Sequence, residues 1–333
     1  MGKLTASEIN LSTLGKLTEG DARKLLEKLR WAHGPVCPHC GVIGDAKRME
    51  SAEETEHRIR DGVLNCRACR KPFTVTVGTI FEGSHIPLSK WLLGFYLFAS
   101  SKKGISALQL QRQLALGSYR TAWHMAHRIR HAMQNDPNPG KLFGIVEADE
   151  VYIGGRPRNP IRGRRHSGQG RGTKKQAVAV LVSRDGSARA RAVHRVDAES
   201  LKGFIREHVA RSANLFTDEW AAYKGLAKEF AGHEVVRHGK HEYARGPGNS
   251  IHSNTAEAFN GLFKRSIAGS WHHISKEHIN RYLDEQVFRW SNRKIDDGQR
   301  TFAALDRVGG VRLYYKRPTR QGPDGGQSLV ACG

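Results

Sequence analysis

Acidic residues are scarce in this sequence. Its 333 residues include 32 Asp or Glu against 54 Lys or Arg, so the formal net charge is +22. A folded protein with this excess of positive charge attracts polyanions, and nucleic acid is the expected partner. Hydrophobic residues still make up 38% of the chain and charged residues 26%. That composition is typical of globular proteins and excludes a basic disordered tail.

Long apolar runs are also missing. The longest, Trp91 to Ala99, has nine residues, whereas a helix that spans a bilayer needs about 20. The first 30 residues alternate charged residues with leucines and contain no secretory h-region. The sequence therefore predicts a cytoplasmic protein without a membrane segment. No Gly-Lys-Ser or Gly-Lys-Thr follows a predicted strand, which excludes an ATP-binding phosphate loop.

Cysteine is rare, and four of the five cysteines form two close pairs. Cys37-Pro-His-Cys40 and Cys66-Arg-Ala-Cys69 are Cys-x-x-Cys knuckles separated by 25 residues. In a reducing compartment such pairs indicate metal ligation and not disulfides. Each knuckle presents two sulfurs to one ion, and together they complete a tetrahedral shell. We therefore expect one structural Zn²⁺ ion, with two unrelated reduced pairs as the alternative.

Turn-forming residues and hydrophobic periodicity divide the chain into parts. The turn formers of 135–140 read as a linker between a front half and a back half. The predicted parts are an N-terminal helix (1–33), a zinc ribbon (34–82), a helix-turn-helix-like region (86–134), an α/β domain (141–296) and a Gly-, Arg- and Pro-rich C-terminal tail (297–333).

The region 86–134 contains two helical stretches, and Gly117 interrupts the second. A helix, a glycine turn and a basic second helix have the outline of a helix-turn-helix motif. The second helix of such a motif enters the major groove of DNA. We expect Arg120 and Arg128 of this helix to contact DNA.

The order of elements predicted for 141–296 is βββαβαβα. This is the order of a ribonuclease H-like mixed sheet, so the fold class is α/β. The predicted strands and helices are Gly144–Ile153, Ala177–Ser183, Ala188–Val196, Ala198–Val209, a strand near Leu215, Trp220–Leu226, Glu234–Arg237, Asn254–Ser266 and Ser275–Asn292.

Isolated carboxylates occur where the predicted strands end. Alternation places Glu147 and Asp149 on one face of an otherwise apolar strand, where a buried acid needs a partner. Asp218 ends a short strand, at the edge where open α/β sheets place their sites. A salt bridge to an arginine is the structural alternative for Asp149, and a helix N-cap is the alternative for Asp218.

Asn254-Thr-Ala-Glu257 precedes an apolar helical stripe. This pattern is also that of a capping box, which is the structural alternative here. Glu257 and Lys264 nevertheless share one helix face, with Gly261 between them. Three carboxylates that converge from two strands and a helix would bind two Mg²⁺ or Mn²⁺ ions, which prefer oxygen ligands and keep open positions for phosphate.

A basic, glycine-rich stretch lies between 156 and 175 and contains no acid. We expect it to follow a phosphate backbone, with a solvated loop as the alternative. His272 and His273 are interpreted as surface or packing residues. The residues of this stretch expected to bind DNA are Arg162, Arg164, Arg165, Lys174 and Lys175.

On these motifs the chain resembles the bacterial zinc-ribbon insertion-sequence transposases of the ISXO-two-like branch, which belong to the DDE transposases. A larger aromatic often follows Phe259 in that family, where this chain has Asn260. The resemblance rests on Leu29-Arg30-Trp31 before the ribbon, Glu147-Ala-Asp149-Glu150 with Tyr152-Ile-Gly154-Gly155, Phe216-Thr217-Asp218, His252-Ser-Asn254-Thr-Ala-Glu257 with Lys264-Arg265, and His272-His273-Ile-Ser followed by Arg281-Tyr282-Leu-Asp284-Glu285 and Phe288-Arg289.

The resemblance implies that Asp149 and Asp218 are the two catalytic aspartates. Asn254 and Glu257 compete for the third position, and Glu257 is favoured because a carboxylate binds divalent metal better than an amide does. Lys264 is the basic partner, and Arg265 beside it is expected to contact DNA.

The expected activity is DNA transposition. The protein would bind the inverted-repeat ends of an element, release 3′ hydroxyls and join them to target DNA. The implied partner is double-stranded DNA at the element ends and the target, and the implied assembly on DNA is a homo-oligomer in the nucleoid. Two alternatives remain: a ribonuclease H-like nuclease without strand transfer, and a catalytically dead zinc-ribbon regulator that binds DNA.

Overall fold

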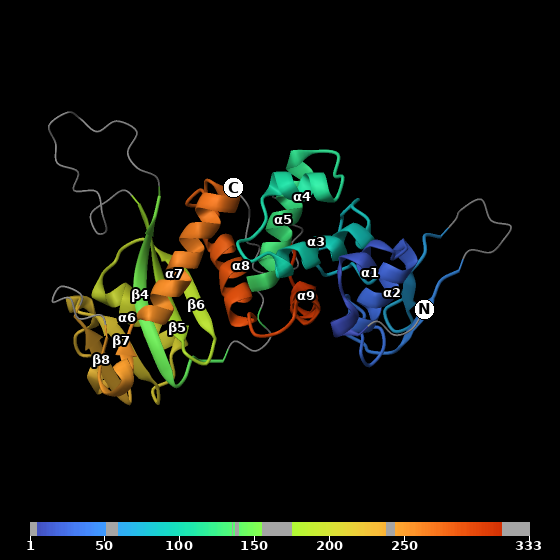
Figure 1. Cartoon of the computed structure of the whole chain (residues 1–333). Helices are drawn as coiled ribbons and strands as arrows, with labels where there is room; N and C mark the ends of the chain where they lie inside the picture. Colours follow the sequence, from blue (N-terminus) through green and yellow to red (C-terminus); the bar gives the residue numbers. More distant parts are fainter. Residues whose placement is uncertain are drawn as a thin grey trace. The chain divides into compact units, whose positions relative to one another are not determined.

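The chain forms two compact units (Figure 1). The computed structural model describes residues 5–50, 59–134, 136, 140–154, 175–237 and 244–314. Unit 1 takes its described residues from 1–101, 105–137 and 295–333, and unit 2 takes them from 102–104 and 138–294. Among the described residues, no helix has both the length and the hydropathy to cross a membrane.

A small antiparallel sheet in unit 1 carries the second cysteine knuckle. Its strands are β1 (Ala46–Arg48), β2 (Leu64–Cys66) and β3 (Pro72–Phe73), in the order β1-β2-β3. Ala46 pairs with Cys66, which brings the two sides of the ribbon together. The alternating run after Phe73 does not extend the strand, because the Val77 N–H donates to the Thr74 carbonyl at 3.1 Å and closes a turn.

Helices form the rest of unit 1. The short elements η1 (Ala6–Glu8) and α1 (Leu11–Gly15) come first, and α2 (Glu19–Arg30) follows behind its N-cap Thr18. The apolar face of α2 buries Ala22, Leu25 and Leu26. The remaining helices of the unit are α3 (Leu88–Ser100), α4 (Ala107–Gln113), α5 (Tyr119–Gln134), α9 (Asp297–Leu305) and η7 (Asp306–Val308).

Two expectations for unit 1 need correction. Arg128 was expected to contact DNA, but its side chain is 5% exposed. It donates to the Glu82 carbonyl at 2.6 Å and lies over the Trp91 ring, because it belongs to the inner face of α5. In addition, the range 297–333 was expected to be a tail, whereas its first residues form α9. That helix begins with a capping box at Asp296 and packs against α3.

A five-stranded mixed sheet forms the centre of unit 2. Its strand order is β6-β5-β4-β7-β8, antiparallel between β4, β5 and β6 and parallel between β4, β7 and β8. This arrangement is the ribonuclease H-like topology that the order of elements predicted. The strands are β4 (Ile145–Ile153), β5 (Gln176–Ser183), β6 (Ala188–Val193), β7 (Asn214–Asp218) and β8 (Gly232–Val236).

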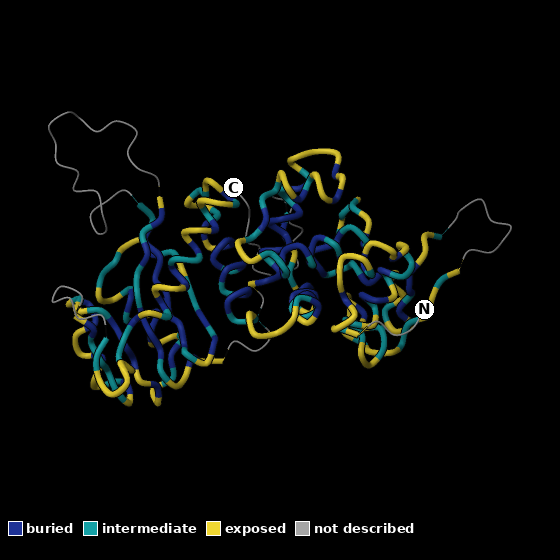
Figure 2. The backbone as a smooth tube through the Cα atoms, viewed as in Figure 1, coloured by how far each residue is buried: buried dark blue, intermediate teal, exposed yellow. Residues whose placement is uncertain are grey.

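Helices cover both faces of this sheet (Figure 1). α6 (Ala198–His208) packs on one face, where Val146 and Ala148 of β4 join its core. α7 (Asn254–Ser266) and α8 (Ile279–Ser291) pack on the other face, where Val151 and Ile153 join the second core. Strands β4 and β5 are therefore mostly buried and dark blue in Figure 2. Asp149 is an odd-numbered residue of β4, like Val151 and Ile153, and so faces α7.

Shorter elements complete unit 2. The helix predicted from Trp220 to Leu226 is instead two 3-10 turns, η2 (Ala221–Tyr223) and η3 (Leu226–Lys228). Gly225 has a φ of +93° between them, and this left-handed conformation interrupts the helix. The chain also contains β9 (Ala244–Arg245), η5 (Pro247–Asn249), β10 (Ile251–His252) and the π-helical turn η6 (Ile267–Trp271).

Candidate active site and cysteine cluster

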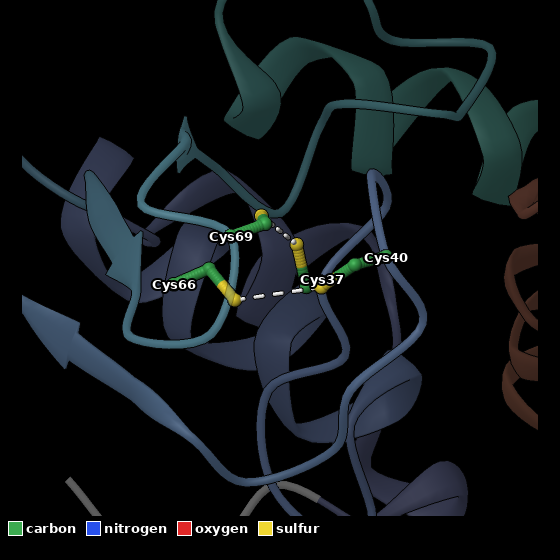
Figure 3. A group of neighbouring side chains, drawn as sticks. All are labelled: Cys37, Cys40, Cys66 and Cys69. Carbon is green, nitrogen blue, oxygen red and sulfur yellow. Dashed lines mark hydrogen bonds between the residues drawn. The ribbon is translucent and has the colours of Figure 1, made fainter.

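The four knuckle cysteines converge in unit 1 (Figure 3). Their sulfur atoms all lie within 4.8 Å of one another, with Cys37 3.7 Å from Cys69 and Cys40 3.6 Å from Cys66. A tetrahedral zinc site with Zn–S bonds of about 2.3 Å has sulfurs about 3.8 Å apart. The cluster therefore has the donors and the spacing of a zinc ribbon.

The pKa of the Cys37 thiol also suits a metal ligand. Burial raises the pKa, but hydrogen bonds from the backbone of His39 and Cys40 and from neighbouring thiols outweigh it and lower the pKa to about 6. A thiolate is the form of cysteine that binds zinc. Despite a backbone hydrogen bond from Val42, burial and hydrogen bonds with the neighbouring thiols raise the pKa of the Cys40 thiol to about 12, so Cys37 is the one of these two thiols that more readily becomes a thiolate.

Asp149 lies in the middle of β4 and points toward α7. Its Oδ1 accepts the Glu150 N–H at 2.8 Å, and its Oδ2 accepts the Asn260 amide at 2.8 Å. No arginine or lysine in the described part of the chain forms an ion pair with it. The structural alternative of a salt bridge for Asp149 is therefore not what the described residues show.

Asp218 and Glu257 come from neighbouring elements. Asp218 is the last residue of β7, the strand that runs parallel to β4, and its Oδ1 accepts the Trp220 N–H at 3.0 Å. That bond closes a local turn and is not the helix N-cap named as the alternative, because the N-cap of the following turn η2 is Trp220. Glu257 lies in the first turn of α7, is exposed, and accepts the Ser253 hydroxyl at 3.2 Å.

The negative charges of Asp218 and Glu257 both act on Asp149. The pKa of Asp149 is raised to about 6, mainly by burial and in smaller part by the negative charges of Asp218 and Glu257, against the hydrogen bonds from Glu150 and Asn260. Among the described residues only the cysteines bring three or more ligand atoms within 4.8 Å of one another. A two-metal site distributes its ligands over ions about 3.5–4 Å apart, so its carboxylates can lie further from one another.

Asn260 is a site residue that the sequence reasoning missed. It lies one turn after Glu257, is 5% exposed, and donates to Asp149. Its Oδ1 is buried without a hydrogen-bond partner. An oxygen of this kind beside three carboxylates fits the oxygen-rich donor set that Mg²⁺ or Mn²⁺ prefers. The signal available in the sequence was its spacing of three from Glu257 on the same helix.

Glu147 has a different role from Asp149, although both face α7. Its carboxylate is fully buried and accepts the N–H groups of Thr255 and Ala256 at 2.7 and 2.9 Å. It also accepts the Thr255 hydroxyl at 2.9 Å and Arg184 Nε at 2.7 Å. Glu147 thus caps α7 from a neighbouring strand, and the helix dipole favours a negative charge at this position.

The start of α7 differs from the capping box that Asn254 and Glu257 suggested. The N-cap is Ser253, with no side-chain cap of its own, and Asn254 is the first helical residue, with an exposed side chain. Glu147 instead accepts the N–H groups of Thr255 and Ala256 in the first turn of the helix. In this arrangement the negative charge of the Glu257 carboxylate still acts on Asp149.

A groove of about 820 Å³ opens in unit 2, between the part of β4 that starts at Glu150, the residue after Asp149, and the end of α7. Among the basic residues expected to contact DNA, Lys175 and Lys264 line it. Arg265 and, in unit 1, Arg120 are exposed. Arg162, Arg164, Arg165 and Lys174 lie outside the described residues.

The fold and the two candidate sites together define a class: a ribonuclease H-like domain with carboxylates on two neighbouring strands and a helix, preceded by a four-cysteine ribbon. The family model described as ISXO2-like transposase domain matches residues 141–291. The model described as transposase zinc-ribbon domain matches residues 17–72.

A relative from Halobacterium salinarum, titled "Uncharacterized protein in transposable element ISH50", is 31% identical over 278 residues. The match covers 80% of this chain and 89% of that protein. The chain belongs to the ISXO2-like transposase family.

Two solved structures of the Mos1 transposase were also found. The Mos1 strand transfer complex is 14% identical, with 65% of this chain and 74% of that chain covered and a TM-score of 0.24. The Mos1 paired-end complex is 13% identical, with 64% and 74% covered and a TM-score of 0.24. TM-scores this low support no comparison of the folds.

Proposed function

We propose that this protein is a DNA transposase that binds the inverted-repeat ends of its element, cleaves them to release 3′ hydroxyls and joins those ends to target DNA. The observation that carries the proposal is the convergence of charge from Asp218 and Glu257 on the buried Asp149 carboxylate, whose pKa is about 6. A site that accumulates negative charge in a protein of net charge +22 is suited to divalent cations and not to DNA alone.

Asp149, Asp218 and Glu257 would hold two Mg²⁺ or Mn²⁺ ions, and Asn260 would keep the Asp149 carboxylate in place. Bound there, the ions would supply a nucleophile at neutral pH and stabilise the leaving oxygen of an in-line displacement. Lys264 would orient a phosphate beside the carboxylates. Glu257 is preferred to Asn254 as the third residue because its charge reaches Asp149.

The cysteine cluster would hold one Zn²⁺ ion. Its role in the proposal is structural, because four thiolates close the tetrahedral shell and leave no position for a substrate. The helix-turn-helix-like segment α4–α5 would contribute DNA contacts through Arg120, which is exposed on the first turn of α5.

The test is a cleavage and joining assay on a duplex that carries the element's inverted repeats, taken from the DNA on either side of the gene. Asp149→Asn, Asp218→Asn and Glu257→Gln should each abolish release of the 3′ hydroxyl while binding of the duplex persists. Glu207→Gln is the matched control, because Glu207 forms an exposed ion pair with Arg191 in the same unit.

Cleavage without joined product would instead identify a nuclease. The complete absence of metal-dependent cleavage by the wild type would identify a DNA-binding regulator. Asn254→Ala should cleave normally. Its loss of activity together with an active Glu257→Gln variant would move the third role to Asn254.

A further inference from the structure

The groove beside the carboxylates is built from three segments of unit 2. The second half of β4 forms one wall, α7 and the turn after it form another, and Lys175 closes the edge before β5. The wall from β4 starts at Glu150, the residue after Asp149. The lining residues are Glu150, Val151, Tyr152, Ile153, Gly154, Lys175, Lys264, Ile267, Ala268, His272, His273 and Ile274.

The polar lining of the groove is mostly basic. Lys175, Lys264, His272 and His273 line it, and the side chains of all four can donate hydrogen bonds. The one acid among the lining residues, Glu150, accepts the Tyr223 hydroxyl at 2.7 Å. The groove therefore presents donors and positive charge to its occupant, which is the chemistry that recognises phosphate.

The remaining lining is apolar. Val151, Ile153, Ile267 and Ile274 supply aliphatic surface between the basic groups. Apolar surface beside hydrogen-bond donors suits a polymer of charged phosphates joined by sugars. A free inorganic anion would gain nothing from the aliphatic walls.

The backbone before α8 is strained where it presents the two histidines. His272 has φ +58° and ψ −46°, and the His273 N–H donates to the Trp271 carbonyl at 2.6 Å. This is a γ-turn with positive φ, a rare and strained conformation. It directly follows the π-helical turn η6, and such turns are frequent at functional sites. Strain of this kind is retained where the surrounding structure uses it.

We propose that this groove binds the sugar–phosphate backbone of the DNA strand that continues from the phosphate held at the carboxylates. His272 and His273 are phosphate-binding residues in it, together with Lys175 and Lys264. This assignment replaces the surface or packing role expected for the two histidines. It rests on the proposed function, because it takes the carboxylate cluster as the place where the strand is cut.

The first experiment measures binding of a short fluorescein-labelled single-stranded oligonucleotide to the full-length protein. Fluorescence anisotropy is recorded over a range of KCl concentrations, with no magnesium or manganese added. Lys175→Gln and Lys264→Gln should each reduce the slope of log affinity against log salt by about 0.7, because each removes one phosphate contact. Lys228→Gln, an exposed lysine outside the groove, should leave the slope unchanged.

The histidines are tested with His272→Gly combined with His273→Ala. Glycine adopts a positive φ without strain, so the turn is kept and the midpoint of thermal unfolding should not fall. The affinity should fall roughly tenfold, as expected for lost hydrogen bonds to charged groups. The matched control is His194→Ala, because His194 is exposed beyond the end of β6.

A second measurement locates the strand directly. A bromodeoxyuridine-containing oligonucleotide is crosslinked by ultraviolet light to the full-length protein, and the modified peptides are identified by mass spectrometry. Crosslinks on the peptide that contains His272 and His273 support the proposal.

Salt slopes and affinities equal to those of the control variants, with crosslinks only elsewhere, would overturn it. In that case metal-dependent cleavage by the wild type would still stand as evidence for the proposed function. If the wild type showed no metal-dependent cleavage while the groove still bound the oligonucleotide, the proposed function would be refuted and the groove assignment would stand.

Discussion

Replacing Asp149 by asparagine should stabilise the metal-free protein while it removes activity. The pKa of Asp149 lies at about 6, against 3.8 for an unperturbed aspartate. One pKa unit corresponds to about 1.4 kcal/mol, so the ionised carboxylate costs the folded state up to about 3 kcal/mol near neutral pH. The asparagine variant lacks this cost, and for a unit of this size its unfolding midpoint should rise by about 5–10 °C.

The pH dependence gives the sign of the effect. A carboxyl group whose pKa is higher in the folded than in the unfolded chain binds its proton more tightly when folded. The free energy of unfolding of the wild type therefore falls as the pH rises from about 4 to about 6. The variant lacks this fall, so the two proteins should differ little below about pH 4 and most above about pH 6.

The local hydrogen bonds survive the substitution. The side-chain carbonyl of the introduced asparagine can accept the Glu150 N–H, and the Asn260 amide can rotate so that its buried, unpartnered Oδ1 accepts from the new amide group. Differential scanning calorimetry at several pH values, without divalent metal, measures the difference. Added Mg²⁺ should then raise the midpoint of the wild type more than that of the variant, because a ligand stabilises the state that binds it.

Two results would refute this reasoning. One is a variant less stable than the wild type near neutral pH. The other is a difference in unfolding free energy that does not change with pH. Either would mean that burial and the charges of Asp218 and Glu257 do not raise the pKa of Asp149 in the folded protein.

The remaining predictions concern the helix anchor and the cysteine cluster. Glu147→Ala should lower the free energy of unfolding, measured by chemical denaturation, by about 3–5 kcal/mol. The reason is that it leaves Arg184 and the first N–H groups of α7 without their buried partner. Glu207→Gln, at the exposed ion pair with Arg191, should change the free energy of unfolding by less than about 1 kcal/mol. Cys66→Ser should lose bound zinc, measured by metal analysis of the purified protein, because three ligands hold the ion less tightly than four. The control is Cys332→Ser, at the one cysteine of the sequence outside the two Cys-x-x-Cys pairs, which should keep the full complement of zinc. Equal zinc contents in the two variants would contradict the four-cysteine site.

Much of the fold follows from patterns that are local in the sequence. Alternation and apolar runs predicted four strands of unit 2 to within three residues of their ends, and a fifth near Leu215 without ends, since side-chain direction along a strand repeats every two residues. The same alternation placed Glu147 and Asp149 on one face, which the structure confirms. The helix predicted after Trp220 was wrong because Gly225 takes a left-handed conformation that periodicity does not reveal.

The sequence was less informative where the environment of a side chain decides its role. Arg128 and Arg120 lie on the same helix, yet Arg128 is buried against the Trp91 ring and Arg120 is exposed. Helical periodicity allowed either to face the solvent, and only the packing of α5 in unit 1 separated them. The helix α9 was missed because a short amphipathic segment beside a Gly- and Pro-rich stretch is recognised only by the surface it packs against, here α3.

The sequence by itself predicted the partner class through its charge and the cysteine cluster through its doubled spacing, and it placed Glu147 and Asp149 on one strand face through alternation. The tertiary structure alone decided that Glu147 anchors α7 while Asp149 gathers negative charge, that Asn260 holds Asp149, and that His272 and His273 line a groove. The physical reason is the separation along the sequence over which each kind of interaction acts. Propensity and periodicity act between residues a few positions apart, whereas the Glu147–Thr255 and Asp149–Asn260 contacts join residues more than 100 positions apart and exist only after the sheet and the helix have packed.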